Sequence, residues 1–302
     1  MSTEKNTTIG IVGQGFVGSA IYKGLKNFHK ILTYDLDKEK CNSTHKELCS
    51  KSDIIFMCLP TPMRKNGNCD TRILEKAISQ FYEIIMNCSL GKNPKHDDFL
   101  NTANRNRKIL IIKSTVPPGT TERINEKFPE IDICFSPEFL TEANSFDDFK
   151  NQTRIIIGGP RLASEAVKQM FRKAFPSIPI VKTETKIAEM VKYFTNCFLA
   201  SKVTFANQMF QVCTDNNIDY NKVCEYALHD KRIGKSHLSV PGPDGDLGFG
   251  GHCFPKDLAA MIAFGSSAGG DIDFLKAVQD YNDKCRRIRD WESMEGRAVS
   301  HD

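Results

Sequence analysis

The sequence of 302 residues lacks the features that mark membrane, secreted and nucleic-acid-binding proteins. Its longest apolar run, Ile54–Leu59, is far shorter than the ~20 residues of a membrane-spanning helix, so we expect no membrane partner. The segment Met1–Asn6 has none of the apolar character of a secretory signal, which favours a cytoplasmic location. Lys and Arg number 41 and Asp and Glu 37, and this small net charge of +4 predicts no nucleic-acid partner.

Glycine (20 residues) and proline (13 residues) are too few for a collagen-like or low-complexity chain. The 11 cysteines are an odd number without a CxxC pair, and we expect reduced thiols that pack in the interior rather than a disulfide scaffold. We also expect no metal site. The length allows about two domains.

The N-terminal part alternates short apolar runs with amphipathic segments. This rhythm predicts a Rossmann-type, doubly wound α/β domain with a parallel sheet over residues 1–182. Asn87–Lys108 interrupts it and is interpreted as a surface insertion. The predicted strands are Thr8–Val12, Lys30–Tyr34, Ile54–Leu59, Ile109–Lys113, Ile131–Cys134, Arg154–Gly158 and Ile178–Val181.

The pattern changes after Val181, and residues 183–302 predict an all-α domain built on a long central helix. Glu184–Asn216 contains neither Gly nor Pro and carries a wide apolar stripe, which favours an inter-domain spine or a dimer contact. A Gly/Pro-rich loop covers Val240–Gly251. Shorter helices are predicted at Tyr220–Leu228, Lys256–Phe264 and Ile272–Arg289.

The clearest ligand motif is Gly13-Gln14-Gly15-Phe16-Val17-Gly18, which fits GxGxxG between a predicted strand and a predicted helix. Asp35 lies 20 residues after Gly15, at the end of the next strand. This arrangement predicts a dinucleotide whose pyrophosphate lies at the helix N-terminus. The Asp35 carboxylate favours NAD over NADP, although Lys38 and Lys40 weaken that preference.

Three further strand ends carry polar side chains. Leu59–Pro62 and Ser114–Gly119 can bind a ligand at the carboxyl edge of the sheet or form ordinary turns. In Ser136–Ala143, Glu138 and Glu142 can bind a sugar hydroxyl, hold a water molecule or cap a helix. The residues alone favour the cap.

The sharpest feature is Cys253, between Gly250-Gly251-His252 and Phe254-Pro255-Lys256-Asp257. A helix N-terminus and Lys256 can lower the pKa of a thiol, so Cys253 is a candidate nucleophile, and Asp257 can orient a water molecule. A buried packing thiol is the alternative. Lys192 and Asn196 share one face of the long helix, either as a polar surface stripe or as donors to an oxyanion.

Taken together, these motifs resemble the UDP-glucose/GDP-mannose dehydrogenase family from about Thr8 to Asn282. The resemblance implies oxidation of a nucleotide sugar at C6, from alcohol to acid, by two hydride transfers to NAD⁺ through a cysteine thiohemiacetal and thioester. It rests on Gly13–Gly18, Lys113–Pro117, Pro137–Leu140, Ala188–Lys192 with Asn196, Asp230–Gly234 and Gly248–Asp257.

The resemblance also implies roles for single residues. Cys253 is the expected nucleophile, Lys192 and Asn196 stabilise the oxyanion, Asp257 assists thioester hydrolysis, and Thr115 and Glu138 hold a water molecule. The expected NAD contacts, beyond Gly13, Gly15, Phe16 and Gly18, are Val17, Asp35, Lys40, Thr61, Thr115, Glu142 and Lys256. The expected substrate contacts are Phe139, Leu140, Lys192, Asn196, Arg232, Phe249 and Gly250.

Substrate and assembly follow from the same resemblance. Arg232–Gly234 and Phe249–Lys256 favour UDP-glucose, with GDP-mannose and UDP-N-acetylhexosamines as alternatives. Family members pair through the long helix, which implies a homodimer in which Arg232 reaches the partner's sugar.

Family members also continue into a second Rossmann-like domain, and this sequence stops where that domain begins. A short active form, a chain completed by another polypeptide and a weakly active NAD-binding subunit are therefore all open. A two-electron 3-hydroxyacid or 6-phosphogluconate-type dehydrogenase, which needs no cysteine nucleophile, is a further alternative.

Overall fold

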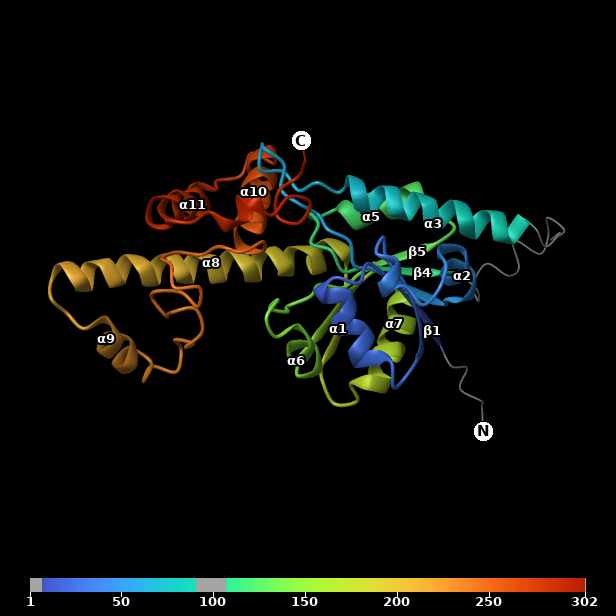
Figure 1. The fold of residues 1–302 in the computed structure, drawn as a ribbon, viewed down its shortest axis with the longest axis horizontal. Coiled ribbons are helices and arrows are strands. Elements are labelled where there is room, and N and C mark those ends of the chain that lie inside the picture. Colours follow the sequence, from blue (N-terminus) through green and yellow to red (C-terminus); the bar gives the residue numbers. More distant parts are fainter. Residues whose placement is uncertain (1–6, 91–106, 302) are drawn as a thin grey trace. The chain divides into compact units, whose positions relative to one another are not determined.

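The computed structural model describes residues 7–90 and 107–301 of the chain. These residues form two compact units. Unit 1 comprises residues 1–61 and 71–192, and unit 2 comprises residues 62–70 and 193–302. Figure 1 follows the chain from its blue N-terminus to its red C-terminus. Within the described ranges, none of the helices combines the length and the apolar character that crossing a bilayer requires.

Unit 1 is built on a seven-stranded sheet with the order β2-β1-β3-β4-β5-β6-β7, which confirms the predicted α/β class. Neighbouring strands are parallel except β5 and β6, which are antiparallel where Phe135 pairs with Gly158. The prediction of a wholly parallel sheet is therefore wrong at this pairing, because a continuous apolar run indicates burial but not direction. The strands are β1 (Thr8–Val12), β2 (Lys30–Tyr34), β3 (Ile54–Met57), β4 (Ile109–Ile112), β5 (Asp132–Phe135), β6 (Ile155–Gly158) and β7 (Ile180–Thr183).

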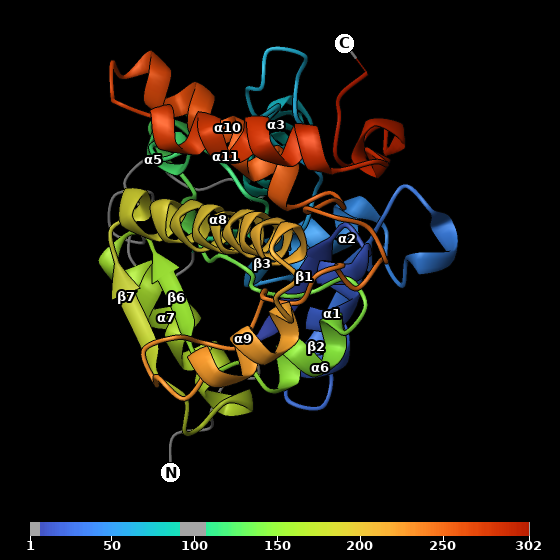
Figure 2. The ribbon, with the colours of Figure 1, turned by 90° about the vertical axis from the view of Figure 1, so that its left-hand side faces the viewer.

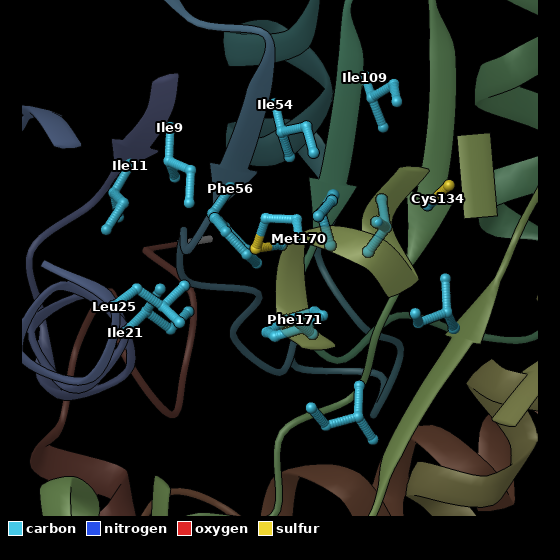
Figure 3. Close-up of a cluster of buried hydrophobic side chains, with 14 of the residues drawn as sticks. Ile9, Ile11, Ile21, Leu25, Ile54, Phe56, Ile109, Cys134, Met170 and Phe171 are labelled. Carbon is cyan, nitrogen blue, oxygen red and sulfur yellow. The ribbon is translucent and has the colours of Figure 1, made fainter. Parts of the chain in front are cut away.

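Helices cover both faces of this sheet, because successive strand residues point to opposite sides. On one face Ile54 and Phe56 pack with residues of α1 (Phe16–Leu25), α6 (Ser145–Lys150) and α7 (Arg161–Ala174), as Figure 3 shows in part. On the other face Ile55 and Met57 pack with residues of α2 (His45–Lys51), α3 (Arg72–Leu90) and α5 (Thr120–Lys127). A short 3₁₀ turn, η1 (Lys38–Lys40), follows β2.

Part of the predicted surface insertion Asn87–Lys108 is helical. Helix α3 continues to Leu90, so the expected loop begins later than Asn87. Weak helix formers are tolerated at the end of an established helix. Residues 91–106 of the predicted insertion lie outside the described residues.

Unit 2 is helical, as predicted, and its centre is the long helix α8 (Thr185–Asp215). Figure 2 looks along α8, with α10 and α11 on one side of it and α9 on the other. Cys197 and Ala200 of α8 pack against α10 and α11, whereas Ala206 and Cys213 pack against Tyr220 of α9. The remaining elements are α9 (Tyr220–Ala227), α10 (Phe254–Ser267), α11 (Asp273–Cys285) and the 3₁₀ turn η2 (Asp290–Ser293).

Among the helix boundaries in unit 2 that differ from the prediction, two bear on the candidate site. Helix α10 begins at Phe254 rather than Lys256, so Cys253 is its N-cap residue. Helix α11 ends at Cys285 rather than Arg289, because Arg286 adopts an extended conformation with φ −76° and ψ 126°. The segment Arg286–Asp290, charged at every position except Ile288, therefore lies outside the helix and bonds to the loop before Cys253.

Candidate active site

The glycine motif forms a tight turn between β1 and α1. Gly13 has φ +87°, and a Cβ on Gly13 would collide with the Cys58 carbonyl. A Cβ on Gly15 would meet no atom within 4 Å, so the space above this residue is open. Gly15 is the N-cap of α1 and no side chain caps the helix. The open space beside this helix N-terminus fits a pyrophosphate, as NAD binding requires.

Asp35 lies beside this turn. One carboxylate oxygen accepts the backbone N–H of Gln14 at 2.5 Å and the other accepts that of Asp37 at 2.9 Å. Lys40, expected near the cofactor, is exposed and pairs with Asp37 at 3.1 Å. A carboxylate held at the glycine turn fits the ribose of NAD, so the residues of this site suit that cofactor.

The ends of β3 and β4 are joined by side-chain hydrogen bonds. The Thr61 hydroxyl donates to the Thr115 carbonyl at 2.7 Å, and both residues are buried. The Ser114 hydroxyl accepts the Leu59 N–H at 3.2 Å and donates to the Leu59 carbonyl at 2.5 Å. Two segments separated by about 55 residues in sequence are thereby fixed together at the carboxyl edge of the sheet, where ligands bind in open α/β folds.

A buried ion pair follows β5 in unit 1. The Lys192 amine donates to the Glu138 carbonyl at 2.8 Å and to its carboxylate at 2.9 Å, and the other carboxylate oxygen accepts the Leu140 N–H at 2.7 Å. Lys192 and Glu138 are only 4% and 8% exposed. Glu138 is therefore not a helix cap and Lys192 is not part of a surface stripe, because each side chain satisfies the other away from water.

A second buried lysine, Lys113, lies in the same cluster. Its amine donates to the Pro137 carbonyl at 3.0 Å. Burial lowers the pKa of Lys113 from its usual 10.5 to about 8, and burial raises the pKa of the nearby Cys58 to about 12. Lys113 stands in the motif Lys113–Pro117, but sequence reasoning assigned it no role.

A partly open cavity of about 280 Å³ in unit 1 gathers several expected site residues. Val17, Glu138, Phe139 and Leu140 line it together with Lys113, Asp147, Asp148 and Arg154. The Arg154 guanidinium lies 4.2 Å from the centre of the Phe139 ring and so fixes that ring by a cation–π contact. A larger cavity of about 780 Å³ in unit 2, between residues 63–68 and α10, is lined by no expected site residue.

Cys253 lies at the start of α10 in unit 2 and is partly buried. Its carbonyl accepts the Asp257 N–H at 2.9 Å, which closes the first turn of the helix. The Asp257 carboxylate accepts a hydrogen bond from Asn196 at 2.5 Å and pairs with Lys256. The structure thus brings Asn196, Lys256 and Asp257 together as a buried group within one turn of Cys253.

The Lys256 ammonium group forms an ion pair with the Asp257 carboxylate. Burial alone would lower the pKa of Lys256, but its interactions with Asp257, Cys69 and Cys253 outweigh burial and raise the pKa. Lys256 therefore stays cationic and interacts with the Asp257 carboxylate and with the two thiols. Cys69 in this group was not anticipated, because it lies about 180 residues away in sequence.

The remaining expected residues differ in exposure. Arg232 has an 89% exposed side chain and pairs with Asp230 at 2.5 Å, and Glu142 is exposed. Phe249 is buried, and Gly250 is partly buried. None of the ten cysteines whose side chains the structure describes forms a disulfide. Among residues 7–90 and 107–301, no group of His, Cys, Asp and Glu is arranged to hold a metal ion.

Known proteins resemble this chain in sequence and in fold. Residues 95–175 match the NAD binding domain of the UDP-glucose/GDP-mannose dehydrogenase family, and residues 186–284 match the central domain of that family. The cofactor is therefore NAD, in agreement with the open glycine turn and Asp35.

Among individual proteins, UDP-glucose 6-dehydrogenase TuaD of Bacillus subtilis is 32% identical over 242 residues, 78% of this chain and 47% of TuaD. UDP-glucose 6-dehydrogenase AglM of Haloferax volcanii is 30% identical over 321 residues, 91% of this chain and 69% of AglM. The structure of a UDP-glucose dehydrogenase from Pyrobaculum islandicum is 26% identical with a TM-score of 0.76, covering 94% of this chain and 69% of that one. The chain thus spans about half to two thirds of the length of these relatives, and it belongs to the UDP-glucose/GDP-mannose dehydrogenase family.

Proposed function

We propose that the chain carries the NAD-dependent oxidation of a nucleotide sugar at C6, from alcohol to acid, with UDP-glucose as the substrate. The observation that carries the proposal is Cys253 at the N-terminus of α10, one turn from the buried group Asn196, Lys256 and Asp257. A packing thiol does not require a neighbouring lysine and carboxylate. The choice of UDP-glucose as the substrate is supported by the related UDP-glucose 6-dehydrogenases.

In this proposal unit 1 holds the cofactor. The N–H groups that follow Gly15 bind the pyrophosphate, and Asp35 accepts hydrogen bonds from the ribose. We assign further contacts to Val17, Lys40, Thr61, Thr115, Glu142 and Lys256. When bound, NAD⁺ accepts the hydride in each of the two oxidations.

The cysteine chemistry begins when the Cys253 thiolate attacks the C6 aldehyde and forms a C–S bond. Lys192 and Asn196 stabilise the negative charge that develops on the former carbonyl oxygen. Loss of hydride from this thiohemiacetal leaves a thioester on Cys253. Asp257 assists a water molecule that attacks the thioester, so that the C–S bond breaks, the carboxylic acid leaves and the thiol of Cys253 is restored.

Two further groups of residues complete the proposed site. Thr115 and Glu138 hold the water molecule that takes part in proton transfer, and the buried Lys192–Glu138 pair keeps the carboxylate oriented. The substrate contacts are assigned to Phe139, Leu140, Lys192, Asn196, Arg232, Phe249 and Gly250. The thiols that the structure describes form no disulfide and so suit the reducing cytosol, where we place the reaction.

We also propose a homodimer through α8. Phe194, Phe198 and Phe205 project from this helix with 70%, 58% and 61% exposure, and the rings of Phe194 and Phe198 stack. An exposed apolar stripe of this kind is typical of a subunit interface. We expect Phe198→Ser to sediment as a monomer. Phe274→Ser, at an equally exposed phenylalanine on α11, serves as the control and should leave the dimer intact.

The experiment that tests the reaction counts NADH formed per nucleotide sugar consumed, with UDP-glucose, GDP-mannose and UDP-N-acetylhexosamines. Wild type is compared with Cys253→Ser, and with Cys224→Ser as a control for a partly buried thiol on α9. A ratio near two that is lost only in Cys253→Ser supports the thioester route. NAD binding without NADH from any nucleotide sugar contradicts a self-sufficient enzyme and supports a subunit completed by another chain. A ratio of one that survives Cys253→Ser supports a two-electron dehydrogenase instead.

A further inference from the structure

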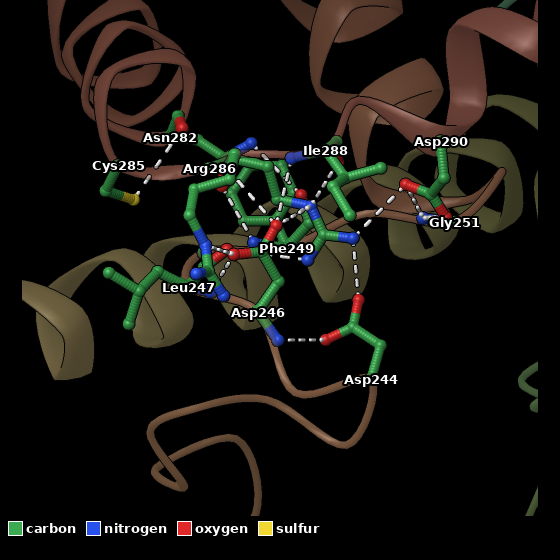
Figure 4. Close-up of polar contacts among 12 residues, drawn as sticks. Asp244, Asp246, Leu247, Phe249, Gly251, Asn282, Cys285, Arg286, Ile288 and Asp290 are labelled. Atoms are coloured by element: carbon green, nitrogen blue, oxygen red, sulfur yellow. Dashed lines mark hydrogen bonds and ion pairs between the residues drawn. The ribbon is translucent and has the colours of Figure 1, made fainter.

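The segment Gly248–Gly251, which precedes Cys253 by one residue, is held by side chains from three helical elements (Figure 4). Asn207 on α8 accepts the Gly248 N–H at 3.0 Å. Asn282 on α11 accepts the Phe249 N–H at 2.7 Å and donates to the Phe249 carbonyl at 3.1 Å. Asp290 of η2 accepts the Gly251 N–H at 3.0 Å. Three of the four peptide N–H groups in the segment are therefore bonded to side chains.

Arg286 is the centre of this arrangement. Its side chain is only 3% exposed, and it donates to Asp244 at 2.6 Å and to Asp290 at 3.2 Å. It also donates to the Ile288 carbonyl at 2.8 Å. Arg286 thus joins the Gly/Pro-rich loop to η2. It also orients the Asp290 carboxylate, which accepts the Gly251 N–H.

Glycine is required in this segment for two separate reasons. Gly248 and Gly251 have φ of +68° and +70°, which few other residues adopt without strain. Gly250 does not have positive φ, but a Cβ there would collide with the Arg286 guanidinium and the Asp290 carboxylate. The backbone of this segment is therefore packed closely against Arg286 and Asp290.

This conformation determines how the chain enters α10. Cys253 follows Gly251 by two residues and is the N-cap of the helix, so rotation of the Gly251 peptide changes where the thiol lies. The hydrogen bonds also leave one N–H, that of Gly250, without a partner among the described residues. The same side chains therefore hold the peptides that lead to the thiol.

We propose that Asn282, Arg286 and Asp290 are positioning residues for the chemistry of Cys253. They act through the backbone of Gly248–Gly251 and touch neither the sulfur nor, in the proposed reaction, the substrate carbon. The inference rests on the proposed function for its effect on turnover, but not for its effect on the thiol.

The test compares Asp290→Asn with Glu292→Gln. Asp290→Asn removes the charge that faces Arg286 and weakens the bond to Gly251. Glu292 is an exposed carboxylate in the same η2 turn and pairs with Arg289 at 3.4 Å, so Glu292→Gln is a matched control. Alkylation of Cys253 by iodoacetamide is followed by peptide mass spectrometry, and kcat and KM are measured separately for NAD⁺ and the sugar.

We expect Asp290→Asn to change the alkylation rate of Cys253 about tenfold and to lower kcat about 10²-fold, because a misplacement near 1 Å has an effect of that size. The KM for NAD⁺ should stay unchanged, and Glu292→Gln should match wild type in every measurement. Asp290→Glu, which retains the charge, should recover part of kcat.

An unchanged alkylation rate and kcat in Asp290→Asn would overturn the inference. If that variant does not fold, Asn282→Asp replaces it, because it keeps the acceptor for Phe249 and loses only the donor. A normal alkylation rate and kcat in Asn282→Asp would then overturn the inference. If wild type forms no NADH with any nucleotide sugar, the proposed function fails, but the alkylation comparison still decides whether these residues position the thiol.

Discussion

The two units hold their buried charges in different ways. In unit 1 the buried Lys192–Glu138 pair joins α8 to the segment that follows β5. In unit 2 the buried Arg286 joins the loop residue Asp244 to Asp290 of η2. The sheet of unit 1 supplies rigid backbone, so one ion pair suffices to orient a carboxylate. In the described part of unit 2 the β-structure is limited to isolated bridges, and the Gly248–Gly251 segment is held by side chains instead. Where backbone scaffolding is absent, buried polar side chains take over its role.

The largest effect that separates the two regions is expected from Lys192→Met. Removing the cation leaves the Glu138 carboxylate buried without its partner, which should lower the free energy of unfolding by about 3 kcal/mol. Turnover should fall at least about 10²-fold, because an oxyanion donor is lost. Denaturant unfolding and NADH formation measure the two losses.

The control for this prediction is Lys186→Met. Lys186 lies on the same helix and pairs with Glu122 at 2.6 Å, but both side chains are exposed. Its loss should cost less than about 1 kcal/mol. The double variant Lys192→Met/Glu138→Gln should regain stability without regaining activity. Equal stability losses in the two single variants would contradict a buried pair in unit 1.

A pair of glycine substitutions sharpens the same comparison. In Gly250→Ala the new Cβ collides with Arg286 and Asp290, so we expect a loss of about 2 kcal/mol in unfolding free energy. In Gly15→Ala the Cβ enters open space, so stability should change by less than about 0.5 kcal/mol while NAD binds more weakly. Thermal unfolding and NAD titration measure both. A Gly15→Ala protein that is destabilised but binds NAD normally would contradict the open turn.

In both regions the free energy of unfolding should rise with pH, but over different pH ranges. In unit 1 the pKa of Lys113 is lowered to about 8, so between pH 8 and 10.5 the unfolded chain binds the proton that the folded chain has lost. Its contribution to stability therefore rises through that range, by roughly 3 kcal/mol in total. Lys113→Met should lack this rise when denaturant unfolding is compared at pH 7 and pH 9.

In unit 2 the dependence lies on the acid side. Arg286 and backbone N–H groups outweigh burial and hold the pKa of Asp244 below its usual value, and the bond from Arg287 does the same for the pKa of Asp246. The stability that these carboxylates contribute is present above about pH 4 and is lost as the pH falls through their folded pKa values. Acid titration of Asp246→Asn should show a smaller loss than wild type, and an equal loss would contradict it.

The smallest effect on stability is expected at Arg232. Its side chain is 89% exposed and pairs with Asp230, so Arg232→Ala should leave the free energy of unfolding nearly unchanged. If the residue contacts the sugar as proposed, the KM for UDP-glucose rises while the KM for NAD⁺ is unchanged. Equal KM values in variant and wild type would remove Arg232 from the site.

Much of unit 1 could be predicted from sequence, because its signals are local. The run Thr8–Val12, the glycine turn and Asp35 lie within 28 residues, and each follows from strand periodicity or turn chemistry. The antiparallel β5–β6 pairing could not be predicted, because it is set by how the chain returns to the sheet. The sequence shows that Lys192 is charged, but the burial of its side chain could not be predicted because it depends on Glu138, 54 residues away.

The side-chain scaffold of unit 2 was hidden for the same physical reason. Asn282 and Arg286 stand four residues apart, and this spacing is typical of an ordinary helix face. Their partners Phe249 and Asp244 are 33 and 42 residues away, and the helix must end at Cys285 for Arg286 to reach them. Amphipathic periodicity does not predict that the chain after α11 folds back onto an earlier loop.

The central claim, that Cys253 carries the reaction through a thioester, is tested most directly by trapping that species. Asp257→Asn, which should slow hydrolysis, is mixed with UDP-glucose and NAD⁺, quenched in acid and digested for peptide mass spectrometry. The account predicts that the Cys253 peptide gains the mass of the nucleotide-sugar acyl group and loses it on treatment with hydroxylamine. NADH formation without any adduct on Cys253, and with full activity retained in Cys253→Ser, would contradict it.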